Sequence, residues 1–359
     1  MISNLQLLRG LAALAVVFFH TSFVIPGMQR TNFQAVAVFF VISGFIMTYI
    51  TRNTADGFLL NRVVRIVPLY WMATIADVVW TKFGFNNIPQ TWTNPRRILA
   101  EFQHFVQTDQ TAFFGDLASS LLFIPRFDGA GAMRYPLLAV GWTLNLEMFF
   151  YVIFAVMLCI NRRLAPLLVA GFLSAVIGYS KIFGCGDLCR FYSHDFVQYF
   201  IYGIAAYYAW RALAAAATSR TARAVAITAS ALAIAGYLVV EATVNGGARI
   251  APVALVLALL VLHSASIRCD WRWAVVFGDA SYALYLTHLI VVDTMRPLAA
   301  QFPVLDFSTA PIGLAVTLAT CLIVALLTHF FVEKPTLKWL RRRLEARNAA
   351  QPHPSVLGT

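Results

Sequence analysis

The sequence has little charge. Only 12% of its 359 residues are Asp, Glu, Lys or Arg, and acidic residues are fewer than basic ones, 16 against 27. Soluble domains carry about 25% charged residues and roughly 45–50% apolar ones, whereas 60% of this chain is hydrophobic. These values exclude an ordinary soluble domain. They predict an all-α integral membrane protein, because only helices and closed barrels satisfy their backbone groups in lipid.

Other absences narrow the class further. The first apolar run, residues 11–25, lacks a basic segment before it and an Ala-x-Ala cleavage site after it, so we expect it to stay as a membrane anchor. No internal repeat is visible, which argues against the two related halves of many secondary transporters. The net charge of +11 comes from short basic clusters between apolar runs, a distribution that argues against nucleic-acid binding.

Cysteine is also scarce. None of the five has the spacing of a zinc site, and we expect no metal. Cys185 and Cys189 share one short connection between apolar segments. A small disulfide is one interpretation, if that connection faces an oxidising compartment. Two unpaired thiols are the other.

Long apolar segments are what the sequence does contain. A membrane span needs roughly 20 mostly apolar residues. We predict a polytopic bundle of about ten spans. Their approximate residue ranges are: 5–25, 33–51, 66–83, 142–160, 164–180, 194–212, 223–241, 250–267, 277–296 and 309–332. Segment 112–124 is apolar but too short to span, so we interpret it as re-entrant or interfacial.

The basic residues give an orientation. If both termini are cytoplasmic, 17 of the 27 Lys and Arg residues fall on the inner side, which satisfies the positive-inside rule. Residues of about 83–140 then form one long outer connection. We divide the chain into a transmembrane domain, residues 1–335, and a basic cytoplasmic tail, residues 336–359. The basic stretch 334–347 is expected to lie on anionic lipid.

Polar residues inside spans cost roughly 2.5–3.5 kcal/mol each on insertion scales, so each needs a reason. Arg9 and His20 are eleven residues apart, about three helical turns, and share one face of the first span. A histidine at this depth is suited to moving protons near neutral pH. The alternative is a histidine hydrogen-bonded in the bundle and an arginine that reaches the headgroups.

Arg62 and Arg65 are three residues apart on one helical face, just before the third span. They fit a phosphate clamp, which arginine forks suit, or a positive-inside anchor. Glu147 lies about one and a half turns into a span with no basic residue nearby in sequence, and we favour a functional role for it. Ser281, Tyr285 and His288 form a polar stripe on another span, which helix-packing hydrogen bonds would explain equally well.

Taken in order, these segments resemble the membrane-bound acyltransferase type 3 family, and most closely its exopolysaccharide O-acetyltransferases. The resemblance includes Trp142, which opens the segment that contains Glu147. Two further runs carry it: Val38-Phe39-Phe40-Val41-Ile42-Ser43-Gly44-Phe45 and Phe331-Val332-Glu333-Lys334-Pro335. The matches extend from residue 5 to residue 335. One departure stands out, because Ala35-Val36-Ala37 occupies the place where the family often has Gly-Val-Asp.

The resemblance implies ten spans in a bacterial inner membrane and transfer of an acyl group from cytoplasmic acyl-CoA to a glycan hydroxyl. The family's Arg-x10-His pattern falls on Arg9 and His20, and its Arg-x-x-Arg pattern falls on Arg62 and Arg65. The buried glutamate of the family corresponds to Glu147.

From these residues we expect His20 to act as general base or transient acyl carrier, with Glu147 as an orienting or proton-relay partner. Arg9, Arg62 and Arg65 are expected to hold the phosphates of coenzyme A. Trp142, Ser281, Tyr285 and His288 are assigned to substrate contact or structure. Acetyl-CoA is expected as co-substrate, with no tightly bound cofactor. The expected partners are a glycan or lipid-linked glycan and membrane lipids. A lipid or small-molecule acceptor, a transporter and a non-catalytic export protein remain alternatives.

Overall fold

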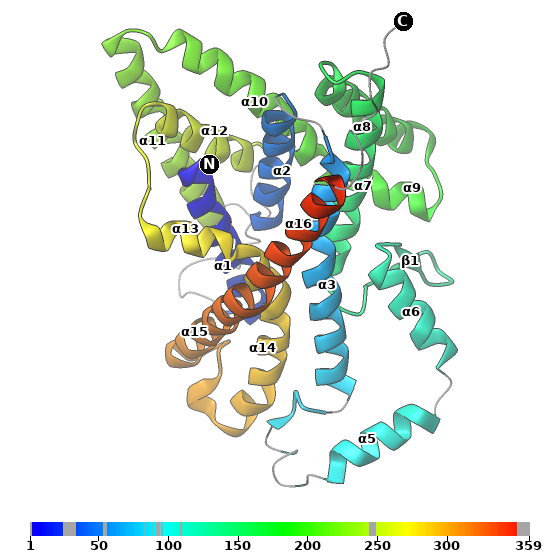
Figure 1. Cartoon of the computed structure of the whole chain (residues 1–359). Coiled ribbons are helices and arrows are strands. Elements are labelled where there is room, and N and C mark those ends of the chain that lie inside the picture. The colour runs from blue at the N-terminus through cyan, green and yellow to red at the C-terminus, as the bar shows by residue number, and fades with distance from the viewer. Residues whose placement is uncertain are drawn as a thin grey trace, which may run out of the picture.

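The computed structural model describes residues 2–23, 34–52, 56–82, 84–88, 90, 94, 96–107, 110–243 and 249–349. Within these residues the chain is almost entirely helical, which confirms the predicted all-α class (Figure 1). The described strands are two residues long and form one hairpin, β1 (Arg126–Phe127) with β2 (Met133–Arg134).

Each predicted span is occupied by a helix. The ten helices are: α1 (Ser3–Thr21), α2 (Ala35–Thr51), α3 (Phe58–Lys82), α7 (Gly141–Ile160), α8 (Ala165–Phe183), α10 (Gln198–Ala216), α11 (Arg220–Thr243), α12 (Ala251–Ser264), α14 (Ser281–Gln301) and α15 (Pro311–Thr328). The other described helical elements are: α5 (Arg96–Gln107), α6 (Thr111–Leu121), α9 (Asp187–Tyr192), η1 (Asp195–Val197), α13 (Arg272–Asp279), η2 (Pro303–Leu305), the π-turn η3 (His329–Glu333) and α16 (Lys334–Ala349).

Not all ten helices meet the length and composition of a full span. Among the described residues, six helices are long and apolar enough to cross a membrane, and the α13–α14 pair makes a seventh if it is one span bent by 61°. Helices α2 and α12 are apolar but shorter. The structure therefore shows a polytopic helical protein with six or seven clear spans, and the number ten remains a prediction.

The predicted outer connection folds into an arm beside the bundle. Segment 112–124 contains a helix, α6, and with α5 it extends away from the packed helices (Figure 1). Two side chains of α3 attach the C-terminal end of α6 to the bundle. The Tyr70 hydroxyl donates to the Ser120 carbonyl at 3.1 Å, and Trp71 Nε1 donates to the Leu121 carbonyl at 2.8 Å.

The predicted cytoplasmic tail begins as a continuous helix. The π-turn η3 joins α15 to α16 without a break, and the two helices run as one diagonal rod (Figure 1). A buried pair stabilises this junction, because His329 Nδ1 lies 2.7 Å from Glu333 Oε2. The last residues of the tail, 350–359, lie outside the described part of the chain.

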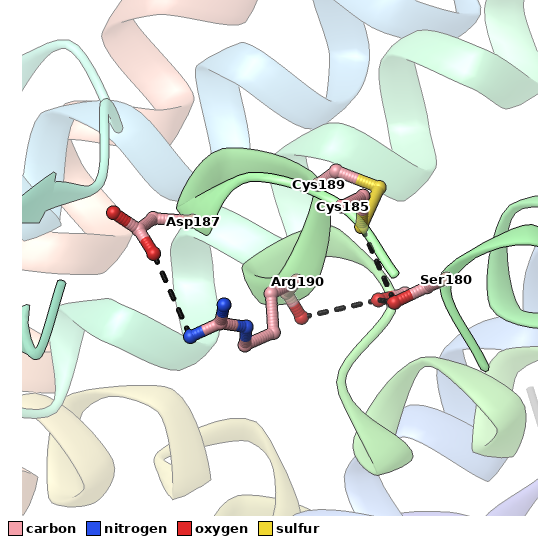
Figure 2. Close-up of a disulfide and its surroundings, with 6 residues drawn as sticks. Ser180, Cys185, Asp187, Cys189 and Arg190 are labelled. Atoms are coloured by element: carbon pink, nitrogen blue, oxygen red, sulfur yellow. Dashed lines mark hydrogen bonds and ion pairs between the residues drawn. A yellow bond between two sulfur atoms is a disulfide. The ribbon is translucent and has the colours of Figure 1, made fainter. Parts of the chain in front are cut away.

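Of the two interpretations of Cys185 and Cys189, the structure shows the disulfide. It closes the turn between α8 and α9, where the Ser180 hydroxyl lies 3.3 Å from Cys185 Sγ and Arg190 pairs with Asp187 at 3.6 Å (Figure 2). Helix α9 then packs Phe191 against Phe127 of the hairpin, with ring centroids 6.4 Å apart. The disulfide thus anchors the segment that leads into η1 and α10.

Helices α2 and α10 approach each other closely enough that their backbones touch. A Cβ atom added at Gly203 of α10 would lie 2.2 Å from the Val41 carbonyl oxygen, and one at Gly44 of α2 would lie 2.2 Å from the Phe200 carbonyl oxygen. Small residues allow such crossings between membrane helices. This contact fixes the position of α2, which contributes residues to both cavities described below.

Replacing Gly203 by Ala therefore tests the packing of the bundle. The added methyl meets backbone atoms, and overpacking of this kind costs about 1–3 kcal/mol. We expect a lower thermal denaturation midpoint for the detergent-solubilised Gly203→Ala variant. Gly178→Ala in α8 is the matched control, because nothing lies within 4 Å of the added atom. Equal midpoints for the two variants would contradict the close crossing.

Candidate active site

Among the cavities lined by the described residues, two contain most of the predicted site residues. We name the first the arginine pocket, of about 120 Å³, whose polar lining includes: Arg9, Ser43, Arg62, Arg65, Glu147, Tyr151 and Ser281. We name the second the histidine cavity, of about 600 Å³, whose polar and aromatic lining includes: His20, Gln34, Tyr135, Trp142, Asp195, Gln198, Tyr199 and Arg249.

Five helices build the arginine pocket, because its polar side chains come from α1, α2, α3, α7 and α14. The Tyr282 hydroxyl donates to the Ile66 carbonyl at 2.9 Å and so ties α14 to α3 beside Arg65. The Ser281 hydroxyl donates to the Gly278 carbonyl at 2.7 Å, at the bend between α13 and α14. On α14, Tyr282 thus joins two helices, while Ser281 and Tyr285 of the polar stripe line the pocket.

Glu147 makes polar contacts with neutral partners. The Ser43 hydroxyl donates to Glu147 Oε1 at 2.9 Å, and the Tyr151 hydroxyl donates to the same oxygen. Arg9 Nη1 donates to Gln6 Oε1 at 3.2 Å, and Gln6 Nε2 in turn donates to Asp279 at 2.8 Å. These two sets of hydrogen bonds hold Glu147 and Arg9 in place, and both side chains line the pocket.

The arginine pocket carries an excess of positive charge. Arg9, Arg62 and Arg65 line it together with Glu147 as its one lining carboxylate among the described residues. The Nε–H of Arg62 is buried and has no hydrogen-bond partner in the described part of the chain. Buried polar groups are almost always paired, and arginine forks bind phosphates and carboxylates in bidentate fashion. The pocket therefore has the charge and the free donor of an anion site.

The histidine cavity is aromatic with a charged rim. The Trp142 ring lies 5.6 Å from Phe196 and 6.0 Å from His194, measured between centroids. At the rim, Asp195 pairs with Arg249 at 3.1 Å. The Tyr199 hydroxyl donates to Gln34 Oε1 at 3.1 Å. Such a cavity, apolar with a few placed polar groups, is typical of an organic ligand site.

His20 meets a second histidine. Its ring centroid lies 5.1 Å from that of His288, which is fully buried. His288 Nδ1 lies 2.8 Å from the Tyr285 carbonyl oxygen. Because a carbonyl only accepts, Nδ1 carries the hydrogen and Nε2 is the basic nitrogen. That Nε2 is buried and has no partner among the described residues.

The structure brings together some of the predicted residues and separates others. Arg9, Arg62 and Arg65, which are expected to bind phosphates, share one pocket, and Glu147 lines the same pocket. His20 and Trp142 line the other cavity. His288, rather than Glu147, is the side chain that lies against His20. The expected pairing of Glu147 with His20 is not observed, because the two side chains line different cavities.

Several site residues were missed by the sequence reasoning. Tyr151 and Thr143 lie four residues either side of Glu147, so helical spacing could have identified them as neighbours on its face. Asp195 lies at the start of the predicted span 194–212 and Arg249 precedes the span 250–267, and no spacing in the sequence links the two. Only the packing of η1 beside the chain before α12 brings that pair together.

The fold and the two cavities define a class: a polytopic helical membrane protein with an arginine-lined pocket and a histidine-lined cavity in one bundle. Residues 2–329 match the family model described as "Acyltransferase domain". The chain belongs to this family and is an acyltransferase, which confirms the resemblance seen in its motifs.

The chain is also similar to the "Exopolysaccharide production protein ExoZ" of Rhizobium meliloti (strain 1021). The two are 26% identical over 318 residues, which cover 86% of this chain and 90% of that protein. No solved structure matches the chain.

Proposed function

We propose that this membrane acyltransferase moves an acetyl group from cytoplasmic acetyl-CoA to a hydroxyl of an exopolysaccharide or a related envelope glycan. The observation that carries the proposal is the pair of cavities. One has excess positive charge and a free guanidinium donor, the other has an imidazole and aromatic walls, and both touch the same two side chains, Val36 and Tyr285.

The donor side follows from charge. Coenzyme A carries several phosphate charges on a long, thin arm that ends in the thioester. Arg62 and Arg65 lie one turn apart on α3, where both can bind phosphate oxygens, and Arg9 adds a third guanidinium. With the phosphates held by these residues, the arm extends towards Val36 and Tyr285, where the pocket meets the histidine cavity.

The chemistry is assigned to His20. Its imidazole removes the proton of the acceptor hydroxyl as the oxygen attacks the thioester carbonyl, and coenzyme A leaves as the thiolate. In the alternative order His20 is acylated first and then passes the acyl group to the hydroxyl. His288 is assigned a positioning role, because its basic Nε2 can accept the N–H of His20 and so hold the ring. Glu147 is assigned a structural role in the arginine pocket, where it accepts hydrogen bonds from Ser43 and Tyr151.

The acceptor side rests on the relative and on the cavity. The name of the Rhizobium meliloti protein refers to exopolysaccharide production. The histidine cavity, at about 600 Å³, has room for a sugar unit beside His20, and Trp142 offers a flat apolar face to a sugar ring. Polar side chains at its rim, including Asp195 and Arg249, can bind sugar hydroxyl groups.

The orientation completes the proposal: ten spans in the bacterial inner membrane, both termini cytoplasmic, and the histidine cavity open to the periplasm. The positive-inside rule supports it, and so does the disulfide. Cys185–Cys189 precedes η1, which contributes Asp195 and Phe196 to the histidine cavity. Disulfides persist in oxidising compartments such as the periplasm and are rare in the cytosol.

Thiol labelling tests this orientation. In a variant that keeps only Cys185 and Cys189, a membrane-impermeant maleimide should label intact spheroplasts only after an impermeant reductant has opened the disulfide. A further Cys185→Ser change leaves Cys189 unpaired and should permit labelling without reduction. Labelling that requires permeabilised membranes in both cases would place this loop in the cytoplasm and overturn the orientation.

His20→Gln tests the proposed chemistry. Glutamine keeps a hydrogen-bonding group but accepts no proton, and general acid–base catalysis is worth roughly 10²–10⁴-fold. We expect transfer of radiolabelled acetyl groups from acetyl-CoA to isolated exopolysaccharide, measured in proteoliposomes, to fall by at least 10²-fold with membrane abundance unchanged. His104→Gln on the exposed face of α5 is the control. Near-normal transfer by His20→Gln would remove His20 from the reaction.

A further inference from the structure

The two cavities meet at two side chains. Val36 lies in the first turn of α2 and Tyr285 in the second turn of α14, and each lines both the arginine pocket and the histidine cavity. Arg62, Arg65 and Glu147 line only the first, whereas His20 lines only the second of these two cavities. Val36 and Tyr285 are therefore the lining side chains that the cavity of the three arginines and the cavity of His20 have in common.

Tyr285 is held in place from a third helix. Its hydroxyl lies 2.6 Å from Thr143 Oγ1 of α7. The Thr143 hydroxyl donates to the Val140 carbonyl at 2.9 Å, and the Tyr285 hydroxyl lies 3.3 Å from the same carbonyl oxygen. The Tyr285 ring also meets Phe39 edge-on, at 5.9 Å between centroids. A side chain with one fixed end and a packed face presents a rigid wall.

Val36 is the side chain of its turn that faces the cavities. Its neighbours Ala35 and Ala37 are small and buried in the bundle, at 3% and 0% exposure, whereas Val36 is half-buried and lines both cavities. The close crossing of α2 and α10 at Gly44 and Gly203 fixes the helix that carries it. The Val36 side of the constriction is therefore carried by a closely packed helix.

We propose that Val36 and Tyr285 form a septum that determines the acyl-chain length this enzyme accepts. The inference rests on the proposed function, because it takes the donor from the arginine pocket and the acceptor from the histidine cavity. An acetyl group adds one methyl beyond the thioester carbonyl, whereas a butyryl group adds two more methylenes that must fit between the branched methyls of Val36 and the fixed Tyr285 ring.

Protein interiors are densely packed, so a change of one methylene alters the fit of a group in such a gap. A difference of one methylene in an apolar pocket changes selectivity by about 10–200-fold. Val36→Ala removes two methyl groups from the septum and should admit longer chains. Val36→Ile adds one methylene and should restrict the gap further. Both changes are conservative at a helix position, and they move the selectivity in opposite directions.

The experiment compares acetyl-, propionyl- and butyryl-CoA as donors to isolated exopolysaccharide, using the full-length protein in proteoliposomes. We expect Val36→Ala to raise the ratio of kcat/KM for butyryl-CoA over acetyl-CoA at least 10-fold. Val36→Ile should lower the ratio for propionyl-CoA over acetyl-CoA. The Kd for free coenzyme A should stay within about twofold in both, because the arginine pocket keeps its charges. Val156→Ala, on the exposed face of α7, is the matched control.

Unchanged donor ratios in both Val36 variants would overturn the septum while wild-type transfer from acetyl-CoA still supported the proposed function. Ratios that change only together with a weaker Kd for coenzyme A would also overturn it, because the effect would then arise in the arginine pocket. A wild-type protein that transfers no acyl group from any of the three donors would overturn the proposed function and, with it, the septum.

Discussion

Charge buried among apolar helices is the constraint on which the rest of this structure depends. Each ionised group in a membrane span must find a partner, a hydrogen-bond network or a ligand, because the surrounding hydrocarbon offers none. Here Glu147 is held by two hydroxyl donors, from Ser43 and Tyr151, and three arginines share its pocket. Satisfying these groups requires α1, α2, α3, α7 and α14 to converge, so the polar site and the packing of the bundle are one arrangement.

The same arrangement divides the interior in two. In the proposed function a phosphate-rich donor needs positive charge and an alcohol acceptor needs a base and room for a sugar ring, and we assign these needs to the two cavities separately. A transfer reaction between two sides of a membrane also needs a barrier at the point where they meet. The hydrogen bond between Tyr285 of α14 and Thr143 of α7 braces the proposed barrier, which in this proposal only the acyl group of the donor crosses.

Much of this fold was predictable, because an apolar run long enough to cross a membrane indicates a helix. Each predicted segment contains a helix, and the residues singled out as polar within spans do line the two cavities or pack beside them. The partners were not predictable. Spacing reports depth and face within one helix, but the rotation of one helix against another depends on packing, such as the contact between Gly44 and Gly203. For this reason the sequence predicts Glu147 as the partner of His20, whereas in the structure the ring that lies against His20 is that of His288.

The most direct test of the central claim is a cryo-EM structure of the protein with a non-hydrolysable thioether analogue of acetyl-CoA. The two-cavity account expects phosphate density within hydrogen-bond distance of Arg62 and Arg65, with the acyl end between Val36 and Tyr285 and the histidine cavity free for the acceptor. Density for the coenzyme in the histidine cavity, or outside the bundle with both arginines unoccupied, would contradict it.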